Sequence, residues 1–254
     1  MNELPFISCK CITYGRVDLL EEALHSFLIQ DYAGPKELVI VNDYPLQTLK
    51  YDHPEVRIFN LSETFSTIGA KENFAVENCR ADIIAVWDDD DVAMPNHLSN
   101  IAKYFVPGSD LLHWQNGVYY NEPDSIALTA LGNSGIVYSR KIWQEIGGHP
   151  LENAGYDMSL VLSIKARSSA IVFATPPNDE VSWFYMWGGR GYHMSGQGTD
   201  TADRPNIIKR HADHIEGLRL EGKIQTGEVN LSPAWRKDYH QMLKDFNSNR
   251  ESLV

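Results

Sequence analysis

Short apolar segments alternate with amphipathic segments along the first hundred residues. Residues 17–30 place leucine, alanine and phenylalanine at helical spacing, with Asp18 and Glu21 as a predicted capping pair, and residues 69–79 are also predicted to be helical. The predicted strands are the compact apolar segments 5–13, 37–43, 56–60 and 82–87. Strands that alternate with helices form βαβ units, so we expect an α/β fold with a doubly wound, mainly parallel sheet flanked by helices.

The pattern is more mixed in the second half of the chain. Predicted helices cover residues 95–105, 140–146 and 157–166, and predicted extended segments cover residues 110–120, 135–138 and 170–174. Residues 183–198 are rich in aromatic residues and glycine, which predicts a functional loop, and a last helix is expected to begin at Ser232-Pro233. No segment has the composition of a linker. We therefore expect one domain over residues 1–200, with a C-terminal extension, residues 201–254, packed on it.

The composition, with 43% hydrophobic and 22% charged residues, is typical of a soluble globular protein. The net charge of −12 disfavours nucleic-acid binding and suits a protein that gathers a divalent cation. No apolar run approaches the roughly 20 residues that span a bilayer, and the amino terminus lacks a secretory signal, so we expect no transmembrane segment and a cytoplasmic location. Cys9, Cys11 and Cys79 form no zinc pattern and leave one cysteine unpaired, which predicts reduced core thiols.

Four consecutive aspartates, Asp88 to Asp91, directly follow the predicted strand 82–87. Adjacent carboxylates repel one another unless a cation compensates them, and Mg²⁺ or Mn²⁺ is the natural partner of such oxygen ligands. The alternative is a solvated acidic turn. Thr13 and Asp43 are the last residues of predicted strands, and ligands of doubly wound sheets bind at the carboxyl ends of the strands.

Several motifs occur together and in a definite order. The first strand ends in Thr13-Tyr14, Asp43 ends the second strand, and Gly69-Ala70-Lys71 begins a helix. The aspartate run is followed by Pro95, and SGIVYSRKIWQEIGGHP follows at residues 134–150. This series, over roughly residues 5–165, resembles the GT-A nucleotide-sugar glycosyltransferases, particularly those of the family-2 type.

The resemblance implies a GT-A fold with a nucleotide-binding half at about residues 1–108 and an acceptor half at about residues 109–200. It also implies a metal-dependent transfer of a sugar from a nucleoside-diphosphate sugar, with UDP expected as the nucleotide, to a hydroxyl acceptor such as a carbohydrate. The implied cofactor is Mn²⁺ or Mg²⁺. Glu72 stands where many relatives carry arginine, which leaves the identity of the nucleotide open.

The same resemblance assigns roles to individual residues. The nucleotide-binding residues it implies are Thr13, Tyr14, Arg16, Asp43, Lys71, Asp88, Asp89 and Arg190. Asp90 and His193 would ligate the metal, and Asp91 is a further acid of the run. Asp157 would be the general base of an inverting transfer, although Tyr156 stands where a second acid is usual; the alternative for Asp157 is a helix cap.

Three other functions stay open at this point. A retaining GT-A enzyme would share the aspartates and the histidine but need no base at Asp157. A nucleotidyltransferase usually has a glycine-rich, basic loop after its first strand, which this chain lacks. A non-catalytic module that binds nucleotide sugars is the third. Five aromatic residues are candidates either for stacking on an acceptor sugar or for core packing: Trp114, Tyr119, Trp183, Tyr185 and Trp187.

Overall fold

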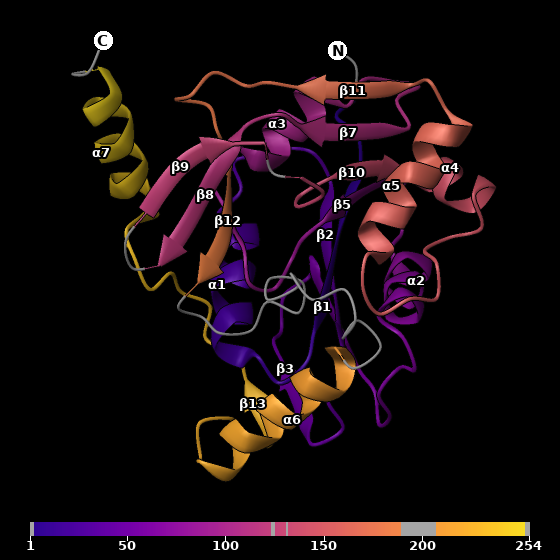
Figure 1. Ribbon diagram of the computed structural model, residues 1–254, viewed down its shortest axis with the longest axis vertical. Coiled ribbons are helices and arrows are strands. Elements are labelled where there is room, and N and C mark those ends of the chain that lie inside the picture. Colours follow the sequence, from indigo (N-terminus) through magenta and orange to yellow (C-terminus); the bar gives the residue numbers. More distant parts are fainter. Residues whose placement is uncertain (1–2, 123–124, 131, 189–206, 252–254) are drawn as a thin grey trace.

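The computed structural model describes residues 3–122, 125–130, 132–188 and 207–251, which form a central sheet with helices on both faces (Figure 1). The helices are α1 (Val17–Leu28), α2 (Ile68–Asn78), α3 (His97–Tyr104), α4 (Arg140–Glu145), α5 (Tyr156–Arg167), α6 (Ile207–Leu220) and α7 (Tyr239–Glu251). No helix in these ranges is both long enough and apolar enough to span a membrane.

The central sheet has seven strands in the order β11-β7-β10-β5-β1-β2-β4. These strands are β1 (Ile7–Thr13), β2 (Lys36–Asn42), β4 (Val56–Asn60), β5 (Ile83–Val86), β7 (Leu111–Trp114), β10 (Val137–Ser139) and β11 (Ile171–Ala174). Strand β1 pairs in parallel with both β2 and β5, and β10 is antiparallel to its two neighbours. The expected doubly wound, mainly parallel sheet is therefore confirmed.

Alternate side chains of β1 face two different cores. Ile7, Cys9 and Cys11 belong to the core that α1 and α3 cover, whereas Ile12 packs against the core under α2 and α5. Figure 1 shows α1 on one side of the sheet and α2, α4 and α5 on the other. Because strand side chains alternate between faces, Lys10 shares the α2 face with Ile12. All three cysteines of the chain are buried and unbonded, which confirms the prediction of core thiols.

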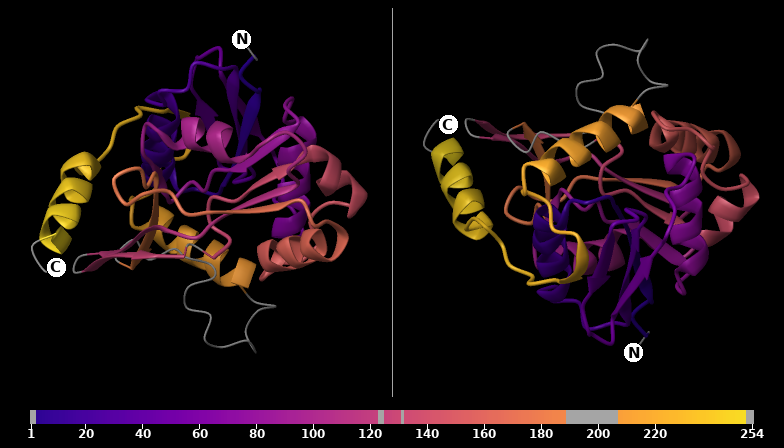
Figure 2. Two further views of the ribbon diagram at one scale, coloured as in Figure 1. Left: turned by 90° about the horizontal axis from the view of Figure 1, so that it is seen from above. Right: turned by 90° about the horizontal axis from the view of Figure 1, so that it is seen from below.

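Two smaller sheets lie outside the central one. The first has the order β6-β12-β8-β9, and the second pairs β13 with β3. Their bounds are β3 (Gln47–Lys50), β6 (Val92–Ala93), β8 (Gly117–Glu122), β9 (Ser125–Thr129), β12 (Trp183–Gly188) and β13 (Gly227–Asn230). Figure 2 shows α7 beside the first of these sheets, where Tyr239 and Leu243 share a core with Val118 and Phe184.

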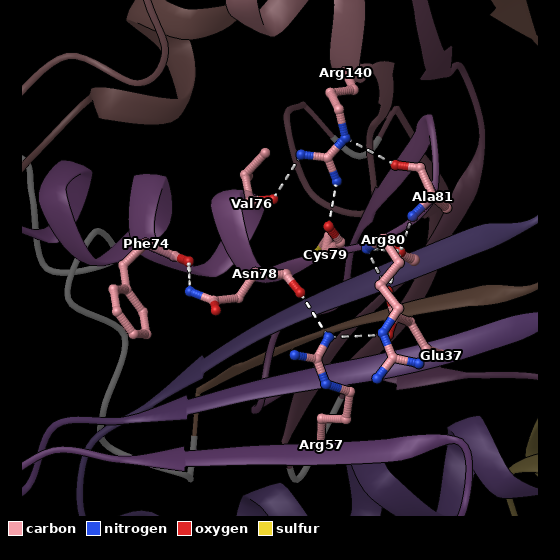
Figure 3. Close-up of polar contacts among 10 residues, drawn as sticks. Glu37, Arg57, Phe74, Val76, Asn78, Cys79, Arg80, Ala81 and Arg140 are labelled. Carbon is pink, nitrogen blue, oxygen red and sulfur yellow. Dashed lines mark hydrogen bonds and ion pairs between the residues drawn. The ribbon is translucent and has the colours of Figure 1, made fainter.

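A polar network ties the amino-terminal ends of the strands to α2. Arg140 donates three hydrogen bonds to backbone carbonyl groups of residues 76, 79 and 81 (Figure 3). Glu37 accepts from the Arg57 guanidinium at 3.3 Å and from the backbone N–H of Arg80 at 2.6 Å. Arg140 thus satisfies the carbonyl group of Val76, and Arg57 that of Asn78 at 2.7 Å, in the last turn of α2, where a helix leaves carbonyl groups without partners of its own.

The structure corrects three local predictions. Residues 183–188 are a strand and not a loop, because β6 and β8 pair with this segment on its two sides. The rest of the expected loop, residues 189–198, lies outside the described residues. The last helix begins at Tyr239 and not at Ser232, because the preceding segment crosses α1 and is hydrogen-bonded there.

The predicted capping pair is also wrong. The N-cap residue of α1 is Arg16, with no side-chain cap. Glu21 instead accepts a hydrogen bond from the backbone of Ser232 at 2.7 Å, and Asp18 forms an ion pair with Arg236 at 3.2 Å. Both acids therefore hold the C-terminal segment, which is a tertiary contact that helix-capping patterns cannot indicate.

Candidate active site

Two cavities meet at the carboxyl ends of β1 and β5. The larger has a volume of about 610 Å³ and the smaller about 80 Å³. Ile12, Arg16 and Ile68 line both of them, so the two cavities adjoin at Arg16. This edge of the sheet is where doubly wound folds bind their ligands.

The smaller cavity is lined by Arg16 and by four other residues that the sequence singled out. Thr13, Tyr14, Asp43 and Lys71 line it, and the Lys71 ammonium forms an ion pair with Asp43. Lys71 also donates to the backbone carbonyl of Thr13 at 2.6 Å, and Asp43 accepts from the backbone N–H of Phe65 at 2.9 Å. Lys71 is only 6% exposed, so it is not a solvated helix position.

Helix α6 forms one wall of the smaller cavity, which the sequence analysis did not predict. His211 lies 5.6 Å from the Tyr14 ring, centroid to centroid, and both residues line the cavity. Ile215 is buried one turn further along, close to Gly15. Burial, together with the nearby charges of Arg16 and Lys71, lowers the pKa of His211 to about 3, so its imidazole is neutral. The sequence feature that could have predicted this helix is the apolar spacing of Ile208, Ile215 and Leu218.

The four aspartates alternate in exposure. Asp88 and Asp90 are half-buried and line the larger cavity. Asp89 is buried and forms an ion pair with Arg16, which also donates to Asp90 at 3.0 Å. Asp91 is 2% exposed and lies in the core. The alternative of a solvated acidic turn is therefore wrong, and the two aspartates that are partly exposed on the wall of the larger cavity are Asp88 and Asp90.

Asp91 accepts three hydrogen bonds inside the core. Its carboxylate receives the Ser134 hydroxyl at 2.6 Å, the Trp183 indole N–H at 3.1 Å and the backbone N–H of Met186 at 2.8 Å. These contacts join the end of the aspartate run to strand β12. Asp91 thus has the surroundings of a structural acid and does not line either cavity.

Burial dominates the electrostatics of the run. Desolvation raises the pKa of Asp88 to about 7, with Lys10 lowering it and Asp90 raising it. Desolvation also raises the pKa of Asp89 to about 6, against the lowering effect of Arg16. Ionising both carboxylates at neutral pH is therefore costly, and an added cation beside them would offset that cost.

The exposed oxygen ligands fit a hard divalent cation. Asp88 and Asp90 present carboxylates to the larger cavity, and Mg²⁺ or Mn²⁺ is commonly bound through one or two carboxylates together with phosphate oxygens and water. Within the described part of the chain no three or more His, Cys, Asp or Glu side chains are arranged so that they could hold a metal ion by themselves. His193 and Arg190, the other residues expected at the metal and the phosphates, lie outside the described residues.

Asp157 lies on the wall of the larger cavity, in the first turn of α5. The side-chain amide of Asn133 donates to its carboxylate at 3.3 Å. The N-cap position of α5 is Gly155, so Asp157 is not the helix cap that the sequence left as its alternative. Desolvation, together with Glu72, Asp88 and Asp157, raises the pKa of the neighbouring Tyr156, whose phenol therefore stays protonated.

Comparison with known proteins agrees with this arrangement. The sequence model of Glycosyl transferase family 2 matches residues 10–161, which include the aspartate run and Asp157. The chain belongs to glycosyl transferase family 2. The uncharacterized glycosyltransferase YwdF of Bacillus subtilis (strain 168) is 32% identical over 112 residues, which cover 42% of this chain and 40% of YwdF.

Two solved structures show that this family-2 chain has the GT-A fold. TarS of S. aureus, residues 1–349 in complex with UDP-GlcNAc, aligns with a TM-score of 0.60 and 16% identity over 82% of this chain and 65% of TarS. The mannosyltransferase PcManGT from Pyrobaculum calidifontis, in complex with GDP-Man and Mn²⁺, aligns with a TM-score of 0.54 and 18% identity over 83% and 70% of the two chains. The chain thus spans less than two thirds of the length of YwdF and of that TarS chain.

The aromatic candidates of this family-2 chain divide between core and cavity. Trp114 and Trp183 are buried and pack in the main core. Tyr119 and Tyr185 line the larger cavity, with ring centroids 5.9 Å apart. The side chain of Trp187 lies outside the described residues. Two of the candidate rings therefore lie on the wall of the larger cavity, and both come from the small sheet that contains β8 and β12.

Proposed function

We propose that this protein transfers a sugar from a nucleoside-diphosphate sugar to a hydroxyl group of an acceptor, with inversion and with Mn²⁺ or Mg²⁺ as cofactor. The observation that carries the proposal is the pair of adjoining cavities joined at Arg16, with Asp90 beside the junction. A nucleoside in the smaller cavity and a sugar in the larger one would place the diphosphate between them, next to a guanidinium and a carboxylate pair.

The smaller cavity supports a nucleoside with a single-ring base, which favours UDP. Its volume is about 80 Å³, and the rings of Tyr14 and His211 lie on its walls. Each oxygen of the Asp43 carboxylate already accepts one hydrogen bond, from Lys71 or from Phe65, and retains a lone pair for a base or ribose donor. TarS is in complex with UDP-GlcNAc and PcManGT with GDP-Man, so the preference for UDP proposed here rests on the residues and volume of this cavity.

Positive charge beside the diphosphate would stabilise it as it leaves. Bound at Asp88 and Asp90, a divalent cation would neutralise the negative charge that develops on the leaving nucleoside diphosphate. Arg16 would add positive charge in the same place, because its guanidinium donates to both Asp89 and Asp90 at the junction of the cavities. Lys71 holds Asp43 and the end of β1 in position for the nucleoside.

Asp157 is the base of the proposed inverting reaction. It would accept the proton of the acceptor hydroxyl as that oxygen attacks the anomeric carbon, and the Asn133 amide would hold its carboxylate in orientation. The acceptor would reach it past Tyr119 and Tyr185, which line the same cavity. A retaining reaction would need no base at this position, so the anomeric configuration of the product separates the two mechanisms.

The test begins with calorimetric titration of the full chain with UDP and with GDP, each with and without Mn²⁺. We expect Mn²⁺-dependent binding of UDP that is tighter than that of GDP. Incubation with nucleotide sugars and a panel of carbohydrate acceptors, followed by NMR of the anomeric proton, then reports the product. Absence of metal-dependent binding of either nucleotide would contradict the proposed function, and a retained anomeric configuration would contradict the role of Asp157.

A further inference from the structure

An ion pair is buried on the α2 face of the central sheet, where packing alone calls for apolar residues. Lys10 lies in the middle of β1, and its partners in register are Val39 on β2 and Val86 on β5. Its ammonium contacts the carboxylate of Glu72 on α2, and the two residues are 3% and 1% exposed. Burying two charges is costly, and apolar residues of similar size are often as stable. The pair is therefore a candidate for a role in binding.

The ion pair lies at the inner end of the larger cavity. Lys10, Glu72 and His149 line it and are at most 4% exposed, whereas Thr129 and Ala130, which line the same cavity, are exposed. The cavity therefore opens to solvent near residues 129–130 and ends at the ion pair. A group that reaches this inner end is therefore surrounded by buried polar side chains.

The inner end has hydrogen-bonding capacity to spare. An ammonium has three N–H donors, and within the described ranges Glu72 is the one hydrogen-bond partner of the Lys10 ammonium. His149 accepts the Trp143 indole N–H at Nδ1, at 3.2 Å, so its proton lies on Nε2. Tyr156 adds a phenol close to His149, with ring centroids 6.4 Å apart. Lys10, Glu72, His149 and Tyr156, the inner cluster, thus combine three kinds of donor with one carboxylate.

We propose that the inner cluster binds the hydroxyl groups of the transferred sugar, with the Lys10–Glu72 pair as its specificity determinant, and that it selects an uncharged sugar. This inference rests on the proposed function. With the diphosphate beside Arg16 and Asp90, the sugar that follows it enters the larger cavity, and an acceptor fills the part nearer to solvent. An ammonium and a carboxylate side by side match vicinal hydroxyl groups, which both donate and accept.

The charge of the cavity decides between sugar classes. Among the described residues that line it, five carboxylates face two cationic side chains: Glu72, Asp88, Asp89, Asp90 and Asp157, against Lys10 and Arg16. The charge of one divalent cation at the aspartates would be balanced by the diphosphate and would leave the carboxylates of the cavity in excess. A carboxylate on the sugar, as in a uronate, would meet Glu72 at close range in a poorly solvated site and be repelled. A hexose or an N-acetylhexosamine has no such charge.

The test measures, in three proteins, how much more tightly a nucleotide sugar binds than the nucleotide alone. Calorimetry with Mn²⁺ would measure the dissociation constants of UDP, UDP-glucose, UDP-galactose, UDP-GlcNAc and UDP-glucuronate, or of GDP and GDP-mannose if GDP is the nucleotide that binds. The proteins are the wild type, the double variant Lys10→Met/Glu72→Leu and the control Glu37→Gln. Glu37 is a buried, ion-paired carboxylate like Glu72 (Figure 3), but it lies at the amino-terminal end of β2 and lines neither cavity.

We expect the double variant to bind the bare nucleotide within about twofold of the wild type. The extra affinity contributed by the best neutral sugar should fall by about tenfold for each hydrogen bond to a charged group that is lost. Glu37→Gln should leave both values unchanged, and the wild type should bind UDP-glucuronate more weakly than UDP-glucose. Removing both charges together leaves none unpaired, so the variant should fold, which circular dichroism checks.

Two results would overturn the inference and leave the proposed function intact: an unchanged sugar contribution in the folded double variant, or equal wild-type affinity for UDP-glucuronate and UDP-glucose. The second comparison uses the wild type alone and so decides the matter even if the double variant does not fold. Failure of the wild type to bind any nucleotide would instead remove the proposed function itself, and the inference with it.

Discussion

Gly69 allows α2 to approach a backbone segment that also borders the larger cavity. A Cβ atom at this position would lie 1.8 Å from the carbonyl oxygen of Pro150 and 3.2 Å from the backbone nitrogen of Glu152. The N–H of Gly69 donates to the carbonyl of Glu152 at 3.0 Å, so the two segments are joined as well as close. Gly69→Ala therefore requires α2 or residues 150–152 to move.

Two effects of opposite sign act on the stability of this variant. Alanine is favoured over glycine within a helix by about 0.5–1 kcal/mol. Overpacking against a backbone atom costs about 1–3 kcal/mol or more, because the atom cannot rotate away as a side chain can. We expect a net loss of about 1–2 kcal/mol in the free energy of unfolding, or a Tm lower by about 2–8 °C for a chain of this size. Because α2 also carries Lys71, which lines the smaller cavity, affinity for UDP should fall too.

Gly217 provides the matched control. It also lies within a helix, α6, but a Cβ atom there would have no neighbour within 4 Å. Gly217→Ala should therefore show the propensity effect alone and raise the free energy of unfolding by about 0.5–1 kcal/mol. Urea denaturation followed by circular dichroism measures both variants. A Gly69→Ala variant as stable as the wild type, beside a stabilised Gly217→Ala variant, would refute the close approach of α2 to residues 150–152.

Four further predictions concern the cavities. Asp90→Asn should abolish Mn²⁺-dependent binding of UDP without lowering stability, since it relieves carboxylate repulsion; undiminished affinity by calorimetry would remove Asp90 from the metal site. Asp157→Asn should lower turnover by at least about 100-fold while the affinity for UDP stays constant, and near-normal transfer would exclude it as the base. His211→Ala should weaken binding of UDP with little effect on that of free Mn²⁺, and equal affinity for UDP would place the nucleoside elsewhere. Folding raises the pKa of Asp88 to about 7, so the stability that this group contributes is complete below about pH 4 and is lost as the pH rises through 7. Asp88→Asn should therefore gain stability relative to the wild type between pH 5 and pH 8. A difference in the free energy of unfolding that does not change with pH, measured by urea denaturation, would contradict this.

Local patterns in the sequence were enough to predict the central sheet and the motifs at its edge. Each strand that was predicted in the first half is a compact apolar segment, and side chains from these strands pack in the cores on the two faces of the sheet. Because parallel strands end at one edge of the sheet, Thr13, Asp43 and the aspartate run come together without further information. Helix α6 and strands β3, β9 and β13 were not predicted, because their partners are distant in sequence or their apolar pattern is weak.

The roles of individual polar residues depended on contacts between distant segments. Four identical aspartates have the same local sequence character, and only the packing of β12 against β6 buries Asp91 and leaves Asp90 on the cavity wall. In the sequence, Lys10 only interrupts an apolar strand. Its partner, Glu72, lies 62 residues away on α2, and the two meet only in the folded chain. Local propensity and periodicity thus determined the sheet and the edge where ligands bind. The tertiary structure decided which charges are buried, because burial and pairing depend on neighbours that a linear pattern does not contain.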